Sequence, residues 1–205
     1  MAFTFFFRDV QALELAIEHV VPDLAGRSRP RIWDAGCAMG PEPYTLAILL
    51  AGRLGNFGFR NLRIEATDLD DTDQFGEVVR QGVYPAGELE RMPAGILEQY
   101  FEPAGQGAFR INERIRTSVR FQRHDLLSFR EIDCGFSLVV CKNVLLHFSQ
   151  AQRVEVIQMF HRALGSGGYL VTEHTQKLPA EAAHLFEQVV PHGQLFRKLE
   201  VEPCA

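Results

Sequence analysis

The sequence has no apolar run long enough to cross a bilayer, because its longest strongly apolar stretch covers only residues 46–51. Its first residues lack the basic segment that opens a secretion signal. The formal net charge is −5, so the field of the whole molecule gives no reason to expect nucleic acid as a partner. Together these absences predict a cytoplasmic protein that neither inserts into a membrane nor binds nucleic acid.

Cysteine and metal-binding patterns are also scarce. The four cysteines lie far apart and form no CxxC pair, which is typical of reduced thiols rather than of a disulfide framework. The seven histidines show neither HxH nor HExxH spacing. The sequence therefore predicts no metal site.

What is present fits one compact domain over residues 1–205, with 46% hydrophobic and 23% charged residues. Patterns typical of strands and of helices alternate along most of the chain. We expect strands at 31–35, 62–67, 136–141 and 169–173, and helices at 8–21, 41–54, 71–80 and 149–164. This order predicts an α/β fold with a mostly parallel central sheet covered by helices on both faces.

The pattern changes between Tyr84 and His124. The segment 88–100 favours short helices, and the turn at 105–107 precedes two alternating runs, 108–112 and 118–122. We expect these two runs to form an antiparallel hairpin in an inserted β-subdomain at about 98–123. Five arginines gather in this region: Arg110, Arg114, Arg116, Arg120 and Arg123. A solvated face is the ordinary explanation for such a run.

A glycine-containing turn, DAGCAMG at 34–40, follows the first strand. In open α/β sheets, ligands bind beyond the carboxyl ends of strands, and Gly36 would let backbone approach a ligand closely. Such a turn alone is equally compatible with a plain strand–helix junction. No G-x-G-x-x-G is present, and Pro41 and Glu42 open the helix where a dinucleotide enzyme presents free N–H groups, which argues against NAD.

An acidic residue, Asp68, ends the second strand, 34 residues after Asp34. A carboxylate at this position can accept hydrogen bonds from both hydroxyls of a ribose. Its alternative role is to cap the next helix, because Asp is a favoured N-cap residue. We favour ribose binding.

Five segments together resemble one family. They are TFFFR at 4–8, IWDAGCAMGPEPYT at 32–45, ATDLD at 66–70, CKNVLLHF at 141–148 and LGSGGYL at 164–170. In the same order, the CheR-type chemotaxis receptor glutamate methyltransferases carry TxFFR, WSAGCSTGEEPYS, ATDID, CRNVLIYF and LKPGGYL. The resemblance implies a Rossmann-like class I fold that binds S-adenosylmethionine (SAM) and releases S-adenosylhomocysteine. It also implies methylation of glutamates on the cytoplasmic domains of chemoreceptors, in bacterial signalling.

The resemblance further implies which residues hold the cofactor: Thr4, Arg8, Ala35, Gly36, Glu42, Asp68, Asp125, Leu126, Lys142 and Asn143. Ala35 and Gly36 match the loop around the methionine part, and Asp68 matches the ribose-binding acid. Asp125 and Leu126 match the pair beside the adenine.

We expect Arg8, Asn143 and His147 to form the acceptor site. A glutamate side chain is already ionised at neutral pH, so its methylation requires positioning rather than a strong base. Arg8 can hold a carboxylate through paired N–H donors. The alternatives are a surface ion pair for Arg8 and a hydrogen-bonded histidine beside an apolar strand end for His147.

Several positions depart from the family pattern. Pro41 replaces the first glutamate of the GEE motif, and only Glu42 remains. The resemblance would assign that first glutamate to the amino group of the cofactor. On a helix, Glu42 points about 100° away from position 41. Lys142 replaces an arginine, and His147 replaces a tyrosine near the transferred methyl. The segment 174–176 stands where relatives have HSE.

Family members carry a small helical domain before the TxFFR motif, and that domain helps to dock the receptor. Here the motif starts at Thr4, so we expect either a shortened protein or a natural variant with another substrate. The resemblance also suggests that a receptor tail docks on the inserted subdomain. Two alternatives to receptor methylation stay open: methyl transfer to a different acceptor, and a non-catalytic module that binds SAM or its product.

Overall fold

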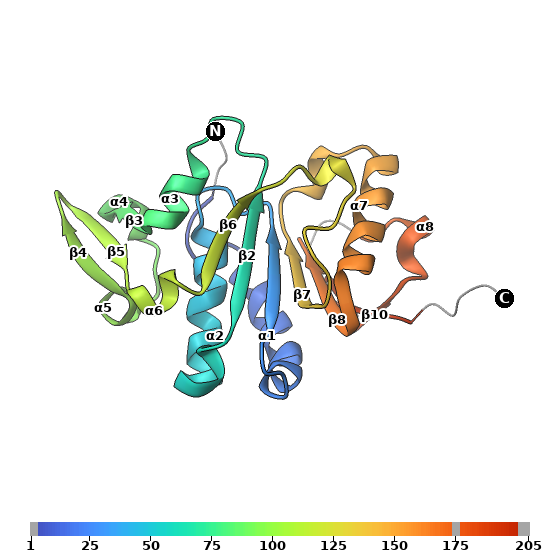
Figure 1. The fold of residues 1–205 in the computed structure, drawn as a ribbon, viewed down its shortest axis with the longest axis horizontal. Helices are drawn as coiled ribbons and strands as arrows, with labels where there is room; N and C mark the ends of the chain where they lie inside the picture. Colours follow the sequence, from blue (N-terminus) through green and yellow to red (C-terminus); the bar gives the residue numbers. More distant parts are fainter. Residues whose placement is uncertain (1–3, 174–176, 201–205) are drawn as a thin grey trace.

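The computed structural model describes residues 4–173 and 177–200, so the segment 174–176 lies outside the described residues. Its main sheet has the strand order β6-β2-β1-β7-β8-β10-β9 (Figure 1). These strands are β6 (Val119–Arg123), β2 (Arg63–Asp68), β1 (Arg31–Ala35), β7 (Phe136–Cys141), β8 (Leu164–Thr172), β10 (Leu195–Lys198) and β9 (Phe186–Gln188). The five strands from β6 to β8 run parallel, and β10 pairs antiparallel with both β8 and β9.

Helices cover both faces of this sheet, as predicted. Residues of α1 (Val10–Ala25) and α2 (Pro41–Phe59) share one buried apolar cluster, and residues of α7 (Gln150–Ala163) and the short α8 (Ala180–Ala183) share another. Successive side chains of β1 alternate between the clusters, with Ile32 in the first and Trp33 in the second. All six residues of β7 are buried, because both faces of a parallel sheet are covered.

The ends of two helices are fixed by local hydrogen bonds. Ser149 and Gln152 form a capping box at the start of α7. The helix predicted at 71–80 is α3 (Phe75–Gln81), which starts later because the carboxylate of Asp70 accepts hydrogen bonds from three N–H groups at its start. Among the described residues, no helix is both long and apolar enough to cross a membrane.

A small antiparallel sheet is inserted between β2 and β6, with the order β3-β5-β4. Its strands are β3 (Val83–Pro85), β5 (Ala108–Ile111) and β4 (Phe101–Gly105), and three short helices accompany them: α4 (Ala86–Leu89), α5 (Ile96–Tyr100) and α6 (Glu113–Arg116). Figure 1 shows this sheet at one end of the molecule, far from α7 and α8. The predicted antiparallel insertion is therefore present.

The prediction of the second strand of this hairpin is wrong. The run 118–122 belongs to β6, which lies parallel to β2 at the edge of the main sheet. The hairpin instead joins β4 to β5, because Gln106 and Gly107 both have positive φ, as a tight two-residue turn requires. Pro103 within β4 obscured this strand in the sequence, since proline is tolerated only at a sheet edge.

The five arginines consequently do not share one hairpin. Arg110 is on β5, Arg114 and Arg116 are on α6, and the last two are on β6: Arg120 and Arg123. Arg123 forms an ion pair with Asp73 at 3.1 Å. The arginine run is spread over three elements; four of the five side chains are exposed and Arg116 is half-buried, so the run is solvated, as expected, although it does not lie on one hairpin.

Candidate functional site

A cavity of about 590 Å³ opens at the carboxyl ends of β1, β2, β6 and β7. This is where open α/β sheets bind ligands. All but one of the residues predicted for the site line it: Thr4, Arg8, Gly36, Glu42, Asp68, Asp125, Leu126, Lys142, Asn143 and His147. The exception is Ala35, which is buried in β1 behind the turn.

Residues that neighbour the predicted ones complete the lining: Ala38, Thr67, Leu69, His124, Leu127, Val144, Leu146 and Phe148. His124 and Leu127 flank the predicted pair Asp125 and Leu126, and the others lie inside the segments that carried the family resemblance, so adjacency was the available signal. Among the described residues, no group of three or more His, Cys, Asp or Glu side chains is placed to hold a metal ion.

The turn after β1 is held by backbone contacts. The N–H groups of Gly36 and Cys37 both donate to the carbonyl oxygen of Thr67, at 2.8 and 3.0 Å. A Cβ on Gly36 would lie 2.2 Å from Cγ2 of Val144, and φ at Gly36 is +105°. The sequence predicted Gly36 because backbone must approach a ligand closely there. The structure adds two further reasons, the packing of Val144 and the positive φ of the turn.

Asp68 is half-buried at the end of β2, with its carboxylate at the cavity wall. Its Oδ2 accepts a hydrogen bond from the N–H of Ala38 at 2.9 Å. The capping role at α3 belongs to Asp70, whose pKa is lowered by hydrogen bonds from the helix N–H groups against the opposing effect of burial. The N-cap alternative for Asp68 is therefore wrong.

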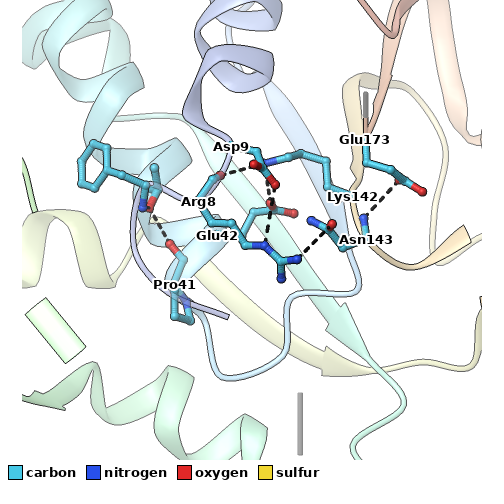
Figure 2. Close-up of polar contacts among 9 residues, drawn as sticks. Arg8, Asp9, Pro41, Glu42, Lys142, Asn143 and Glu173 are labelled. Atoms are coloured by element: carbon cyan, nitrogen blue, oxygen red, sulfur yellow. Dashed lines mark hydrogen bonds and ion pairs between the residues drawn. The ribbon is translucent and has the colours of Figure 1, made fainter. Parts of the chain in front are cut away.

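A buried lysine links the helix α2 to the N-terminal segment (Figure 2). Nζ of Lys142 donates to Oε2 of Glu42 and to the carbonyl oxygen of Arg8, both at 3.0 Å, and the lysine side chain has no exposed surface. Burial raises the pKa of Glu42, and Lys142 opposes this effect. Glu42 therefore faces the cavity, whereas Pro41 is buried at the first position of α2 and does not line it.

Arg8 and Asn143 meet at the cavity. Nη2 of Arg8 donates to Oδ1 of Asn143 at 3.1 Å, and Nε of Arg8 lies 3.6 Å from the carboxylate of Asp9. Asn143 has a positive φ of 60°, and its backbone N–H donates to Oε2 of Glu173 at 3.1 Å (Figure 2). Arg8 thus makes the ion pair considered as its alternative role and also contacts a predicted active-site residue.

The imidazole of His147 lines the cavity and makes no hydrogen bond to another residue in the described part of the chain. The alternative of a hydrogen-bonded histidine is therefore not what the structure contains. Asp125, in contrast, has a local role, because its Oδ1 accepts from the N–H of Leu127 at 2.8 Å at the start of the 3₁₀ turn η1 (Leu126–Ser128).

Asp34 is a residue whose importance the sequence analysis missed. Its side chain is completely buried in β1, and neither carboxylate oxygen has a hydrogen-bond partner in the described structure. Burial raises its pKa well above the ordinary value, the charges of Glu42 and Asp68 act in the same direction, and Lys142 acts against them. Its place within the glycine turn was visible in the sequence, but the absence of a partner was not.

Comparisons with known proteins agree on one family. A family model described as CheR methyltransferase, SAM binding domain, matches residues 2–192. The chain is 28% identical over 194 residues to a probable chemotaxis protein methyltransferase of Rhizobium etli, with 91% of this chain and 72% of the relative covered. It is 33% identical over 167 residues to a chemotaxis protein methyltransferase of Listeria monocytogenes, with 80% and 61% covered.

Among solved structures, a TehB-like SAM-dependent methyltransferase from Corynebacterium glutamicum superposes with a TM-score of 0.51. The identity is 16%, and the match covers 88% of this chain and 83% of that one. At this identity the likeness supports the fold alone, and it confirms the predicted class I methyltransferase architecture.

Proposed function

Because the chain belongs to the CheR methyltransferase family, we propose that it transfers methyl groups from SAM to glutamate carboxylates of methyl-accepting chemotaxis proteins. The family match confirms the resemblance inferred from the five sequence segments. The protein is a SAM-dependent methyltransferase. The receptor as acceptor, the cytoplasm as location and the roles of individual residues are parts of the proposal.

The charges around the cavity fit this cofactor, which supplies a methyl group on a positively charged sulfur when it is bound. The acidic side chains of Glu42 and Asp68 line the cavity, and both act electrostatically on the buried carboxyl group of Asp34 beside it. The two oxygens of Asp34 lack a partner among the described residues. Acidic groups in this position favour a ligand that carries an ammonium and a sulfonium group, and such a ligand would in turn favour the ionised form of Asp34.

Individual residues can then be assigned to parts of the cofactor. Asp68 would accept hydrogen bonds from the ribose hydroxyls, and Asp125 and Leu126 would flank the adenine. Glu42, held by Lys142, would lie near the amino group in place of the glutamate that Pro41 replaces.

The observation that carries the acceptor assignment is the contact between Arg8 and Asn143 at the cavity, at 3.1 Å. A guanidinium binds a carboxylate through charge-assisted hydrogen bonds. Lys142, which also lines the cavity, is buried and is already engaged by Glu42 and by the carbonyl of Arg8. Arg8 therefore orients the acceptor carboxylate, and Asn143 orients Arg8, so that the chain contributes positioning and exclusion of water rather than proton transfer.

The test is transfer of a labelled methyl group to cytoplasmic receptor fragments, with SAM affinity measured in parallel. Arg8→Ala is expected to lower transfer at least about 100-fold while SAM affinity stays within a few-fold, because the lost contacts act on the acceptor. Arg53→Ala, at an exposed position of α2, is the matched control. Equal loss of transfer and of SAM affinity in Arg8→Ala would refute this division of roles.

A second candidate keeps the methyl transfer but changes the acceptor. It is favoured by His147, whose imidazole lines the cavity without a hydrogen bond among the described residues. An imidazole can remove a proton from an acceptor that is not ionised at neutral pH. Transfer to small amines or hydroxyl compounds but not to receptor fragments would favour this candidate.

We also propose that the small sheet docks the receptor. Strand β4 is an edge strand of that sheet, and its residues 102–105 are exposed. An exposed edge can pair with an extended peptide. Capture of receptor fragments is compared between wild type and Arg110→Glu, on the neighbouring β5. Unchanged capture would mean that the charge of the small sheet does not contribute to docking.

A further inference from the structure

A second cavity, of about 320 Å³, adjoins the first and shares Lys142 and Asn143 with it. The rest of its wall comes from Asp9 and the start of α1, from the end of β8 with Glu173, and from the turn before β10 that contains His192 and Gln194. It has no role in the cofactor assignments above.

Glu173 presents an unsatisfied group to this cavity. The residue is only 4% exposed. Oε2 accepts the hydrogen bond from Asn143, whereas Oε1 is buried without a partner among the described residues. Figure 2 shows the carboxylate with one oxygen directed at Asn143 and the other directed away from it. Burial raises the pKa of Glu173, as expected for a carboxylate that is only half satisfied.

A second acceptor in the same cavity is also unsatisfied. Oε1 of Gln194 is buried and has no hydrogen-bond partner in the described structure. The buried ammonium of Lys142, which also lines this cavity, donates to Glu42 and to Arg8 instead. Buried oxygens without donors carry a free-energy cost that a ligand with N–H groups would remove.

We propose that the second cavity binds a basic side chain of the methyl-accepting protein, an arginine or a lysine close to the methylated glutamate, through the oxygens of Glu173 and Gln194. This rests on the proposed function. The two cavities meet at Lys142 and Asn143, so one acceptor segment can place its glutamate at Arg8 and a neighbouring side chain in the second cavity. At 320 Å³ the space is at the lower limit of ligand sites, which suits one side chain.

The first experiment does not depend on activity. Ethylguanidinium and ethylammonium are titrated into the full chain with S-adenosylhomocysteine present, and ethylurea serves as the neutral match. Ethylguanidinium or ethylammonium should bind at least about tenfold more tightly than ethylurea, and Glu173→Gln should abolish the difference, since charge-assisted hydrogen bonds are the strong ones. Glu187→Gln, at an exposed position of β9, is the control and should retain it. Equal binding of the three probes by wild type would overturn the proposal.

The second experiment separates a protein side chain from a free amine as the occupant. Peptides with one glutamate carry one arginine at successive neighbouring positions, each beside a version with the neutral isostere citrulline. At one position, arginine should lower KM at least about tenfold relative to citrulline, and that ratio should fall to about one in Glu173→Gln, whatever the overall rate. If peptides are methylated with no arginine preference at any position, the proposal is overturned. If no peptide and no receptor fragment is methylated, the proposed function fails, and the probe titration alone decides whether the cavity binds cations.

Discussion

The two halves of the site are built differently. Around the ends of β1 and β2, polar groups of the turn and of the next loop are satisfied by backbone: Asp68 by Ala38, Asp70 by the start of α3, and two turn N–H groups by Thr67. Around the ends of β7 and β8, one buried oxygen of Glu173 and one of Gln194 have no hydrogen-bond partner in the described structure, and the exposed imidazole of His147 makes no hydrogen bond to a described residue. Polar groups held by backbone contacts suit the cofactor, which is the same in every reaction cycle. Side chains without partners suit the acceptor, which differs from one methylation site to another.

Removing the Asp68 carboxylate should have the largest effect on the cofactor half. Asp68→Ala is expected to weaken SAM binding at least about 100-fold, since each hydrogen bond to a charged group contributes about 1.5–3 kcal/mol. Calorimetric titration measures this. Asp73→Ala removes a carboxylate from the same loop that pairs with Arg123 at the surface and does not line the cavity, and it should leave the affinity unchanged. A similar loss in both variants would mean that the loop as a whole, not the carboxylate, determines binding.

A methyl group on the turn should be almost as disruptive. Gly36→Ala places a Cβ against Val144 at a backbone angle that favours glycine, and we expect it to lower the free energy of unfolding by about 2–3 kcal/mol. Denaturant unfolding measures the change. Combining it with Val144→Ala should recover part of the loss, because the clash is then relieved. No recovery would assign the entire effect to backbone strain.

Asp34 is an exception among the polar groups at the ends of β1 and β2, as the buried Nε2 of His124 is beside β6, and the effect of Asp34 depends on pH. Folding raises its pKa, so the folded state binds a proton that the unfolded state has lost, and stability falls as pH rises above about 4. Asp34→Asn has no such proton, so it should match wild type near pH 4 and exceed it at pH 8 by about 1 kcal/mol or more, since one pKa unit corresponds to about 1.4 kcal/mol. The measurement is the free energy of unfolding of wild type and Asp34→Asn at pH 4 and pH 8, without cofactor. A constant difference across the range would contradict the assignment to Asp34.

The smallest effect on binding and stability is expected in the acceptor half. His147→Phe removes an imidazole that makes no hydrogen bond among the described residues. We expect the free energy of unfolding to change by less than about 0.5 kcal/mol and SAM affinity to change by less than about twofold. Thermal unfolding and calorimetry measure these. A large loss of SAM affinity would place His147 in the cofactor half and contradict the division of the site into two halves.

The same division explains what the sequence could predict. The cofactor half is formed by short contiguous segments at strand ends, such as the turn at 34–40 and the segment 66–70. The order of strands and helices in the sequence predicts that these segments meet at one edge of the sheet. The second cavity joins Asp9, Glu173 and Gln194, which lie far apart in the chain and come together only through the antiparallel strand β10. No periodicity or motif indicated that strand. The β4–β5 hairpin was missed for a local reason, because Pro103 breaks the alternation expected of a strand.

Calorimetric titration of wild type and Arg8→Ala with SAM shows whether the SAM site is preformed and separate from the acceptor site. Wild type is expected to bind SAM with micromolar affinity, and Arg8→Ala is expected to retain that affinity within a few-fold. Absence of binding by well-folded wild type would contradict this expectation, and would mean that Pro41 has disabled the cofactor site.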